Sequence, residues 1–145
     1  MFEVTFLGHQ GWQFSADGTN ILLDPLLCQG FGHDPRGNGF DIYPPRQLDL
    51  KNCPPIDAVV FSHEHEDHFN VPSIERLDRR IPVYLSARSS SAARSLLTEL
   101  GFVVELLEPG KPLGVGRLAD KQPKTGAFGQ GRGYFTQEAA LIGVK

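Results

Sequence analysis

The sequence has little of what marks secreted, membrane-spanning or disulfide-stabilised proteins. Its two cysteines, Cys28 and Cys53, lie 25 residues apart without a CxxC spacing, so we expect free thiols in a reducing cytoplasm rather than a disulfide. No stretch approaches the roughly 20 apolar residues that a membrane-spanning helix needs. The first five residues contain neither the basic segment nor the apolar run of a secretory signal. These absences favour a cytoplasmic protein.

Positive charge is also scarce, and it is unevenly distributed. The net charge of −3 argues against a general nucleic-acid binder. Residues 1–109 hold eight Lys and Arg against fifteen Asp and Glu, whereas residues 110–145 hold six against two, together with eight of the sixteen glycines. The chain has enough apolar residues for one core. We therefore expect one domain over residues 1–109, followed by a glycine-rich, basic tail over residues 110–145.

Alternating apolar residues predict an antiparallel meander at the N-terminus. Phe2, Val4 and Phe6 fall on one face of the first expected strand, and a turn around Asp17-Gly18 separates the second strand from the third. The expected strands are residues 2–7, 12–15 and 21–23. Between residues 25 and 56 the periodicity disappears, and we expect a partly ordered loop at the mouth of a site.

The middle of the chain alternates between strand and helix patterns, which predicts an α/β unit with parallel strands. The expected strands are residues 57–62, 82–85 and 102–107, and the expected helices are residues 73–80 and 89–100. Serines at the start of the second helix and Gly101 after its end are typical of helix caps. Together with the meander, this unit predicts an α/β (α+β) fold with a mixed sheet flanked by helices.

A cluster of metal-binding side chains follows the first strand of this unit. Residues 61–68 hold three of the five histidines and three of the seventeen acids. His63 and His65 are two residues apart in extended backbone, so both imidazoles lie on the same side and suit adjacent corners of a tetrahedral zinc site. Asp67 and His68 follow where the chain turns, and they are placed to serve a second metal. A solvated His- and Glu-rich loop is the plainer alternative.

The cluster resembles the metallo-β-lactamase superfamily, whose motif matches His63-x-His65-x-Asp67-His68. The N-terminal hairpin that ends in Leu22-Leu23-Asp24-Pro25 is also similar to that family. Within it the chain is most similar to the ascorbate-lactonase-like metal-dependent hydrolases, in which a Gly-His pair such as Gly8-His9 precedes the second strand. The resemblance covers residues 1 to about 109.

The resemblance implies an αββα sandwich, of which this chain holds the N-terminal half. It also implies two zinc ions, with manganese or iron as alternatives, and a metal-bound hydroxide that attacks an ester, lactone, amide or phosphoester. By this likeness His63 and His65 bind the first metal and Asp67 and His68 the second, and Asp67 also orients or deprotonates the bridging water. Asp24 supports the metal loop or simply ends a strand, and His9 is a substrate or supporting contact or a structural histidine.

The chain departs from the family after this cluster. The family uses a further histidine for the first metal, a bridging acid and a last histidine for the second, yet no histidine follows His68. The altered tail fits a truncated or frame-shifted copy, or a genuine variant with a mobile tail. Two readings of function therefore stay open: a hydrolase acting on an unknown small molecule, and a catalytically incomplete fragment that binds metal weakly or acts as an interaction module. Neither a nucleic acid nor a membrane is expected as a partner, and an exposed half-sandwich sheet would favour oligomers.

Overall fold

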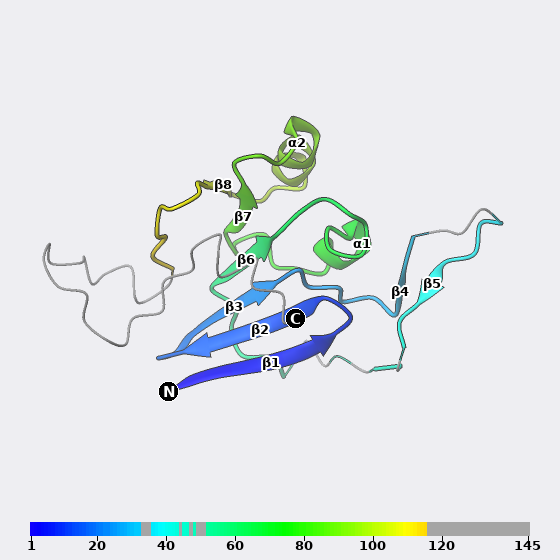
Figure 1. Ribbon diagram of the computed structural model, residues 1–145, viewed down its shortest axis with the longest axis horizontal. Coiled ribbons are helices and arrows are strands. Elements are labelled where there is room, and N and C mark those ends of the chain that lie inside the picture. The colour runs from blue at the N-terminus through cyan, green and yellow to red at the C-terminus, as the bar shows by residue number, and fades with distance from the viewer. Residues whose placement is uncertain (33–35, 44, 47, 49–51, 116–145) are drawn as a thin grey trace, which may run out of the picture.

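The computed structural model places the chain around one six-stranded mixed sheet, with strand order β1-β2-β3-β6-β7-β8 (Figure 1). The strands are β1 (Phe2–Gly8), β2 (Gly11–Ala16), β3 (Thr19–Leu23), β6 (Ala58–Phe61), β7 (Val83–Ser86) and β8 (Val104–Leu107). The structure describes residues 1–32, 36–43, 45, 46, 48 and 52–115. The predicted tail beyond residue 115 lies outside the described residues.

One half of the sheet is an antiparallel meander, as predicted. β1 pairs with β2 so that Val4 lies opposite Phe14, and β2 pairs with β3 so that Phe14 lies opposite Ile21. The turn between β2 and β3 has positive φ at both Asp17 and Gly18. Two such residues make the hairpin turn whose twist matches that of the flanking strands.

The other half is parallel, which confirms the mixed sheet. β3 pairs with β6, β6 with β7, and β7 with β8, all in parallel. Every residue of β6 is buried, which explains why its sequence reads as a continuous apolar run rather than an alternating one. This strand leads directly into the histidine cluster.

Two helices cover the parallel half. α2 (Ser91–Glu99) begins after Ser90, whose side chain accepts a hydrogen bond from the Ala93 amide, and the predicted helix over residues 89–100 is confirmed at its centre. α1 (Val71–Ile74) is much shorter than the predicted helix over residues 73–80.

Side-chain hydrogen bonds, invisible to periodicity, set the bounds of α1. Asn70 caps its start by accepting from the Ser73 amide at 3.0 Å. Beyond Ile74 the chain runs into a turn in which the Asp78 carboxylate accepts from the Arg80 amide at 2.9 Å. Asp side chains that bond nearby backbone amides compete with a continuing helix, and the predicted bounds were wrong for this reason.

The core lies mainly between the sheet and the helices. Figure 1 shows both helices beside β6 and β7, away from β1. The buried apolar residues on this side include Leu22, Val59, Phe61, Phe69, Ile74, Val83, Leu85 and Leu97. A smaller cluster covers the opposite face of the sheet, made of Ile21, Ala58, Val60, Tyr84 and Val115. Among the described residues, the sheet is therefore covered best in its parallel half.

The loop predicted between residues 25 and 56 contains a short hairpin, β4 (Gly30–Phe31) with β5 (Phe40–Asp41), which extends away from the main sheet (Figure 1). Cys28 and Cys53 are both free, as expected. Among the described residues no helix has the length and apolar character to cross a bilayer.

Candidate metal centre

The site begins where two neighbouring parallel strands end side by side. β3 and β6 run in register with Leu23 opposite Val60, and the Asp24 amide continues the ladder by donating to the Val60 carbonyl at 2.9 Å. Because parallel strands share their carboxyl edge, Asp24 and Ser62 emerge together. The sheet thus places a carboxylate beside the start of the histidine loop.

Asp24 is the centre of a hydrogen-bond network under the histidines. Its Oδ1 accepts from the Ser62 amide at 2.7 Å, and its Oδ2 accepts from the Ser62 hydroxyl at 2.6 Å. The same Oδ2 lies 2.8 Å from Nδ1 of His68. Asp24 is 4% exposed and has a φ of 46°, a conformation that Asp tolerates better than most residues. This network orients His68 and fixes the loop at its first residue.

The loop then turns sharply and is anchored to α1. The amides of His68 and Phe69 both donate to the His65 carbonyl, at 2.8 and 2.7 Å. At the start of α1, the Ser73 hydroxyl accepts from the Leu27 amide at 2.8 Å, which joins α1 to the segment after β3. The turn brings His68 back toward His63.

The three histidine rings lie together at this turn. The ring centroids of His63 and His68 are 3.9 Å apart, and those of His63 and His65 are 4.6 Å apart. Burial, together with the nearby charges of His68 and then His65, lowers the pKa of His63. His63 is therefore held neutral at pH 7, and a neutral imidazole is the form that binds metal.

Asp67 lies between His9 and His68. Nε2 of His9 is 3.1 Å from Oδ2 of Asp67, and the His9 ring packs against Phe31 with centroids 4.9 Å apart. Burial alone would raise the pKa of Asp67, but the hydrogen bond from His9 and the charge of His68 outweigh it and lower that pKa. Asp67 is therefore a carboxylate at neutral pH.

The donor set fits a metal ion in part. Zinc ligands at about 2.0–2.1 Å in a tetrahedron lie about 3.4 Å from each other, and Nε2 of His68 is 3.6 Å from Oδ2 of Asp67. Because Nδ1 of His68 faces the Asp24 carboxylate, its Nε2 carries the free lone pair, as in carboxylate–histidine–zinc arrangements. Within the described ranges, however, no three His, Cys, Asp or Glu side chains are arranged so that they could hold a metal ion. The residues are assembled, but the described part of the chain does not complete a shell.

The structure brings together all six residues singled out from the sequence. They are His9, Asp24, His63, His65, Asp67 and His68. Their roles toward a metal stay predictions. Sequence reasoning missed Ser62, which bridges Asp24 to Nδ1 of His63 at 2.9 Å, because a lone serine carries no signal.

Glu64, in the same loop, has its hydrogen-bond partner on another element, at the start of α2. Its carboxylate accepts from the Ser90 hydroxyl at 2.6 Å and from the Ser90 amide at 2.5 Å. These hydrogen bonds, the hydroxyl first, lower the pKa of Glu64. Glu64 thereby ties the histidine loop to the start of α2.

A cavity of about 600 Å³ lies away from the cluster, at the opposite end of β6. No histidine is among the described residues that line it. Its arginines are engaged, since Arg76 donates to the Leu27 carbonyl at 2.9 Å and Arg80 pairs with Asp78. The concentration of metal-binding groups, rather than this cavity, therefore marks the candidate site.

Relatives among curated proteins match only part of the chain. Proteins of Mycobacterium bovis and Mycobacterium tuberculosis, described as uncharacterized, are 30% identical over 79 residues. The match covers 51% of this chain and 20% of each relative. The chain thus spans a small part of the length of these relatives, and their names carry no activity to compare.

Solved structures share the fold. A possible metal-dependent hydrolase from Veillonella parvula superposes with a TM-score of 0.55 at 22% identity, over 78% of this chain and 44% of that chain. An isothiocyanate hydrolase from Delia radicum gut bacteria gives 0.55 at 19% identity, over 74% and 41%. A diiron β-hydroxylase from Streptomyces venezuelae gives 0.56 at 22% identity, over 79% and 22%. The chain thus has the metallo-β-lactamase-type fold over less than half the length of these proteins.

The sequence profile of the beta-lactamase superfamily domain matches residues 3–137. That range contains the six site residues. It continues to residue 137, whereas the resemblance seen in the sequence covers residues 1 to about 109. Neither the profile nor the hydrolases of the same fold give this chain a substrate or a reaction. This chain belongs to the beta-lactamase superfamily.

Proposed function

We propose that this chain carries the metal-binding end of a metal-dependent hydrolase that cleaves an ester, lactone, amide or phosphoester of a small molecule. One observation carries the proposal. His68 has Nδ1 2.8 Å from the Asp24 carboxylate and Nε2 3.6 Å from Oδ2 of Asp67. A histidine held by a buried carboxylate on one nitrogen and facing a second ligand group with the other is the arrangement that metal sites use.

Each side chain has a separate task in this proposal. His63 and His65 would hold one metal ion, and Asp67 and His68 a second. Asp24 orients His68 from below, and His9 holds Asp67 in place through the 3.1 Å hydrogen bond. A bound metal pair would supply Lewis-acid polarisation of the scissile bond and a source of nucleophilic water at neutral pH.

The state of Asp67 defines its contribution. Because its pKa is lowered, Asp67 is ionised at neutral pH and accepts hydrogen bonds. It would therefore orient a water molecule or take a proton from it, rather than donate one. Its second contact, to His9, keeps Oδ2 directed into the cluster.

Zinc is the metal that this donor set favours, because imidazole and carboxylate ligands suit it. Imidazole and carboxylate also bind iron and manganese, and a diiron protein is among the structures of the same fold. The donor set therefore suits zinc, iron and manganese, with zinc favoured.

A second candidate is a domain that binds metal weakly and does not turn over substrate. Two observations favour this candidate. No histidine follows His68, and within the described ranges no group of three His, Cys, Asp or Glu side chains could hold a metal ion. Two ligands per metal fix geometry poorly, so affinity and turnover would both be low.

Hydrolysis assays on the full chain test the proposal. The protein is loaded with zinc, manganese or iron and given chromogenic esters, lactones, amides and phosphoesters. We expect turnover that is lost in Asp67→Asn and His63→Ala and kept in Glu66→Gln, an exposed neighbour in the same loop. If no metal gives turnover, or if Asp67→Asn turns over as fast as the wild type, the hydrolase proposal is wrong.

A further inference from the structure

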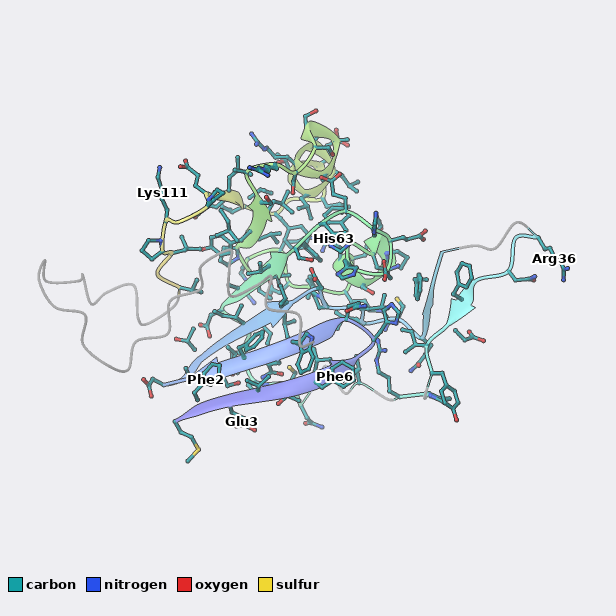
Figure 2. The ribbon with its side chains drawn as sticks, in the orientation of Figure 1. Phe2, Glu3, Phe6, Arg36, His63 and Lys111 are labelled. Carbon is teal, nitrogen blue, oxygen red and sulfur yellow. The ribbon has the colours of Figure 1, made fainter. Side chains whose placement is uncertain are left out.

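The first strand forms an open edge of the main sheet. β1 pairs with β2 on one side, and within the described residues no strand lies on its other side. All five residues from Phe2 to Phe6 are exposed. Figure 2 shows Phe2, Glu3 and Phe6 along this border of the molecule. An edge strand offers a row of backbone donors and acceptors that another strand can use.

One side of this edge is apolar. Phe2, Val4 and Phe6 are 62%, 45% and 56% exposed, and they share one face because strand side chains alternate. Two rings of β2 extend the same face: Phe14 packs on Phe2 with centroids 6.3 Å apart, and Trp12 packs on Phe6 at 4.7 Å. The result is an apolar stripe with two ring pairs and Val4 between them, which we call the β1–β2 stripe.

The strand lacks the usual protection against edge pairing. Proteins blunt exposed edges with lysine, proline, bulges or very short strands. β1 has seven residues with neither lysine nor proline, and Glu3 is its one charged side chain. The one irregularity in its register lies at its end, between Phe6 and Gly8. The opposite edge differs: β8 has only four residues and is followed closely by Glu108-Pro109.

The sequence of β1 is complementary to itself when reversed. If two copies run antiparallel with Val4 opposite Val4, Phe2 faces Phe6 and Glu3 faces Thr5. No like charges oppose each other in this register, and the ring-bearing positions meet in pairs. Aromatic pairs across strands stabilise a sheet, whereas like charges directly opposite destabilise it.

We propose that β1 pairs antiparallel with β1 of a second copy of this chain, with Val4 opposite Val4 of the partner subunit. The two six-stranded sheets would join into one continuous sheet across a two-fold axis. The β1–β2 stripes of both copies would then adjoin and shield part of their exposed rings. This inference does not depend on metal binding or hydrolysis.

The strength of this contact follows from its size. A single strand pair with its flanking rings is smaller than the roughly 1,200–2,000 Å² of most stable interfaces. We therefore expect a reversible dimer, whose fraction rises with protein concentration, rather than a permanent one.

Sedimentation of the full chain over a range of concentrations tests the pairing. The wild type should shift from monomer to dimer, and Val4→Lys should stay monomeric because it places two ammonium groups opposite each other. Val103→Lys is the matched control, since Val103 is an exposed valine as well (62%, against 45% for Val4) but lies outside β1, and it should dimerise as the wild type does. Circular dichroism checks that each variant is folded.

Charge changes at Thr5 test the register without touching the apolar face. Thr5→Lys would place an ammonium opposite Glu3 of the partner subunit twice per dimer, so dimerisation should tighten about five-fold. Thr5→Glu should weaken it by a similar factor. The same two substitutions at the exposed Thr98 of α2 should leave the dimer unchanged.

Three results would overturn the proposal. The first is a wild type that stays monomeric at all concentrations. If the β1 amides of that monomer were protected from hydrogen exchange, another part of the chain would cover the edge. A dimer that forms equally well in Val4→Lys would place the contact elsewhere. A dimer insensitive to the charge at residue 5 would exclude this register.

Discussion

The parallel and antiparallel halves of the sheet differ in how they are covered. β6 and β7 are buried beneath α1 and α2, whereas β1 is exposed along most of its length. The parallel half supplies the histidine loop at the end of β6. The antiparallel half supplies the two side chains that hold this loop, His9 after β1 and Asp24 after β3. The candidate site is therefore a junction between the buried half of the sheet and the exposed half.

The backbone at the two contributed residues supports this view. His9 and Asp24 both have positive φ, 55° and 46°. Such conformations cost energy for residues other than glycine and tend to occur at functional positions. In both residues the conformation follows a strand end and directs a polar side chain to the histidine loop.

The largest contrast between the halves should appear in the core. Phe61 is 1% exposed and packs edge-on against Phe69, with centroids 5.0 Å apart, whereas Phe6 is 56% exposed. Phe61→Ala should lower the free energy of unfolding by about 3–5 kcal/mol, and Phe6→Ala by about 1 kcal/mol. Urea denaturation measures both. Equal losses would contradict the assignment of the core to the parallel half.

The junction itself is tested by Asp24→Asn. Asparagine tolerates the positive φ and keeps the size of the side chain, but its amide no longer accepts from both Ser62 and His68. Loss of a carboxylate behind a metal-binding histidine typically costs 10–100-fold in metal affinity. We expect that loss for zinc in a competition titration.

Asp17→Asn is the control for this experiment. Asp17 has a φ of 50° in the turn after β2, but it is exposed, and its ion-pair partner among the described residues is the N-terminal amine. The zinc affinity of the Asp17→Asn variant should equal that of the wild type. An equal loss in both variants would mean that Asp24 acts through the backbone and not through His68.

Replacing a glycine that has a positive φ should lower the free energy of unfolding by the same amount in both halves of the sheet. Gly18 in the antiparallel hairpin and Gly101 after α2 have φ of 81° and 89°, and an added Cβ at either would meet no atom within 4 Å. Gly18→Ala and Gly101→Ala should each destabilise the protein by about 1 kcal/mol, because alanine is strained at positive φ. Thermal unfolding measures both. A clear difference between them would show that packing also contributes at one position.

The smallest effect is expected where the histidine loop meets α2. Glu64→Gln should cost about 0.5 kcal/mol at pH 7, since an acid near a helix N-terminus is stabilising. Because the pKa of Glu64 is lowered from its ordinary value of 4.5, its contribution is present above that pH and is lost as the pH falls through the folded-state pKa. The difference between variant and wild type should therefore vanish in acid.

A second acid on α2 provides the control. Glu99 lies at the C-terminal end of the helix, where a negative charge is unfavourable, so Glu99→Gln should not destabilise at pH 7. If Glu64→Gln costs as much at low pH as at pH 7, charge is not the source of its effect.

The sequence predicted the sheet well because its signals are local. Alternation located β1 and β2, and the continuous apolar run located β6. The histidine motif located the site because its four residues, His63, His65, Asp67 and His68, lie within a stretch of six. These features need no knowledge of long-range contacts.

The remaining features depend on contacts between distant residues. The bounds of α1 depend on side-chain hydrogen bonds of Asn70 and Asp78. The role of Ser62 depends on Asp24, which is 38 residues away. Alternation in β1 showed which residues share a face, but it could not show that no other described part of the chain packs on this face. Those facts exist only in the folded chain.

X-ray absorption at the zinc edge tests the metal centre most directly. On the zinc-loaded full chain we predict imidazole scattering at about 2.0–2.1 Å, which decreases in His68→Ala and is unchanged in Glu66→Gln. A zinc spectrum without imidazole, or one that is identical in the wild type and His68→Ala, would contradict the assignment of this junction as a metal site.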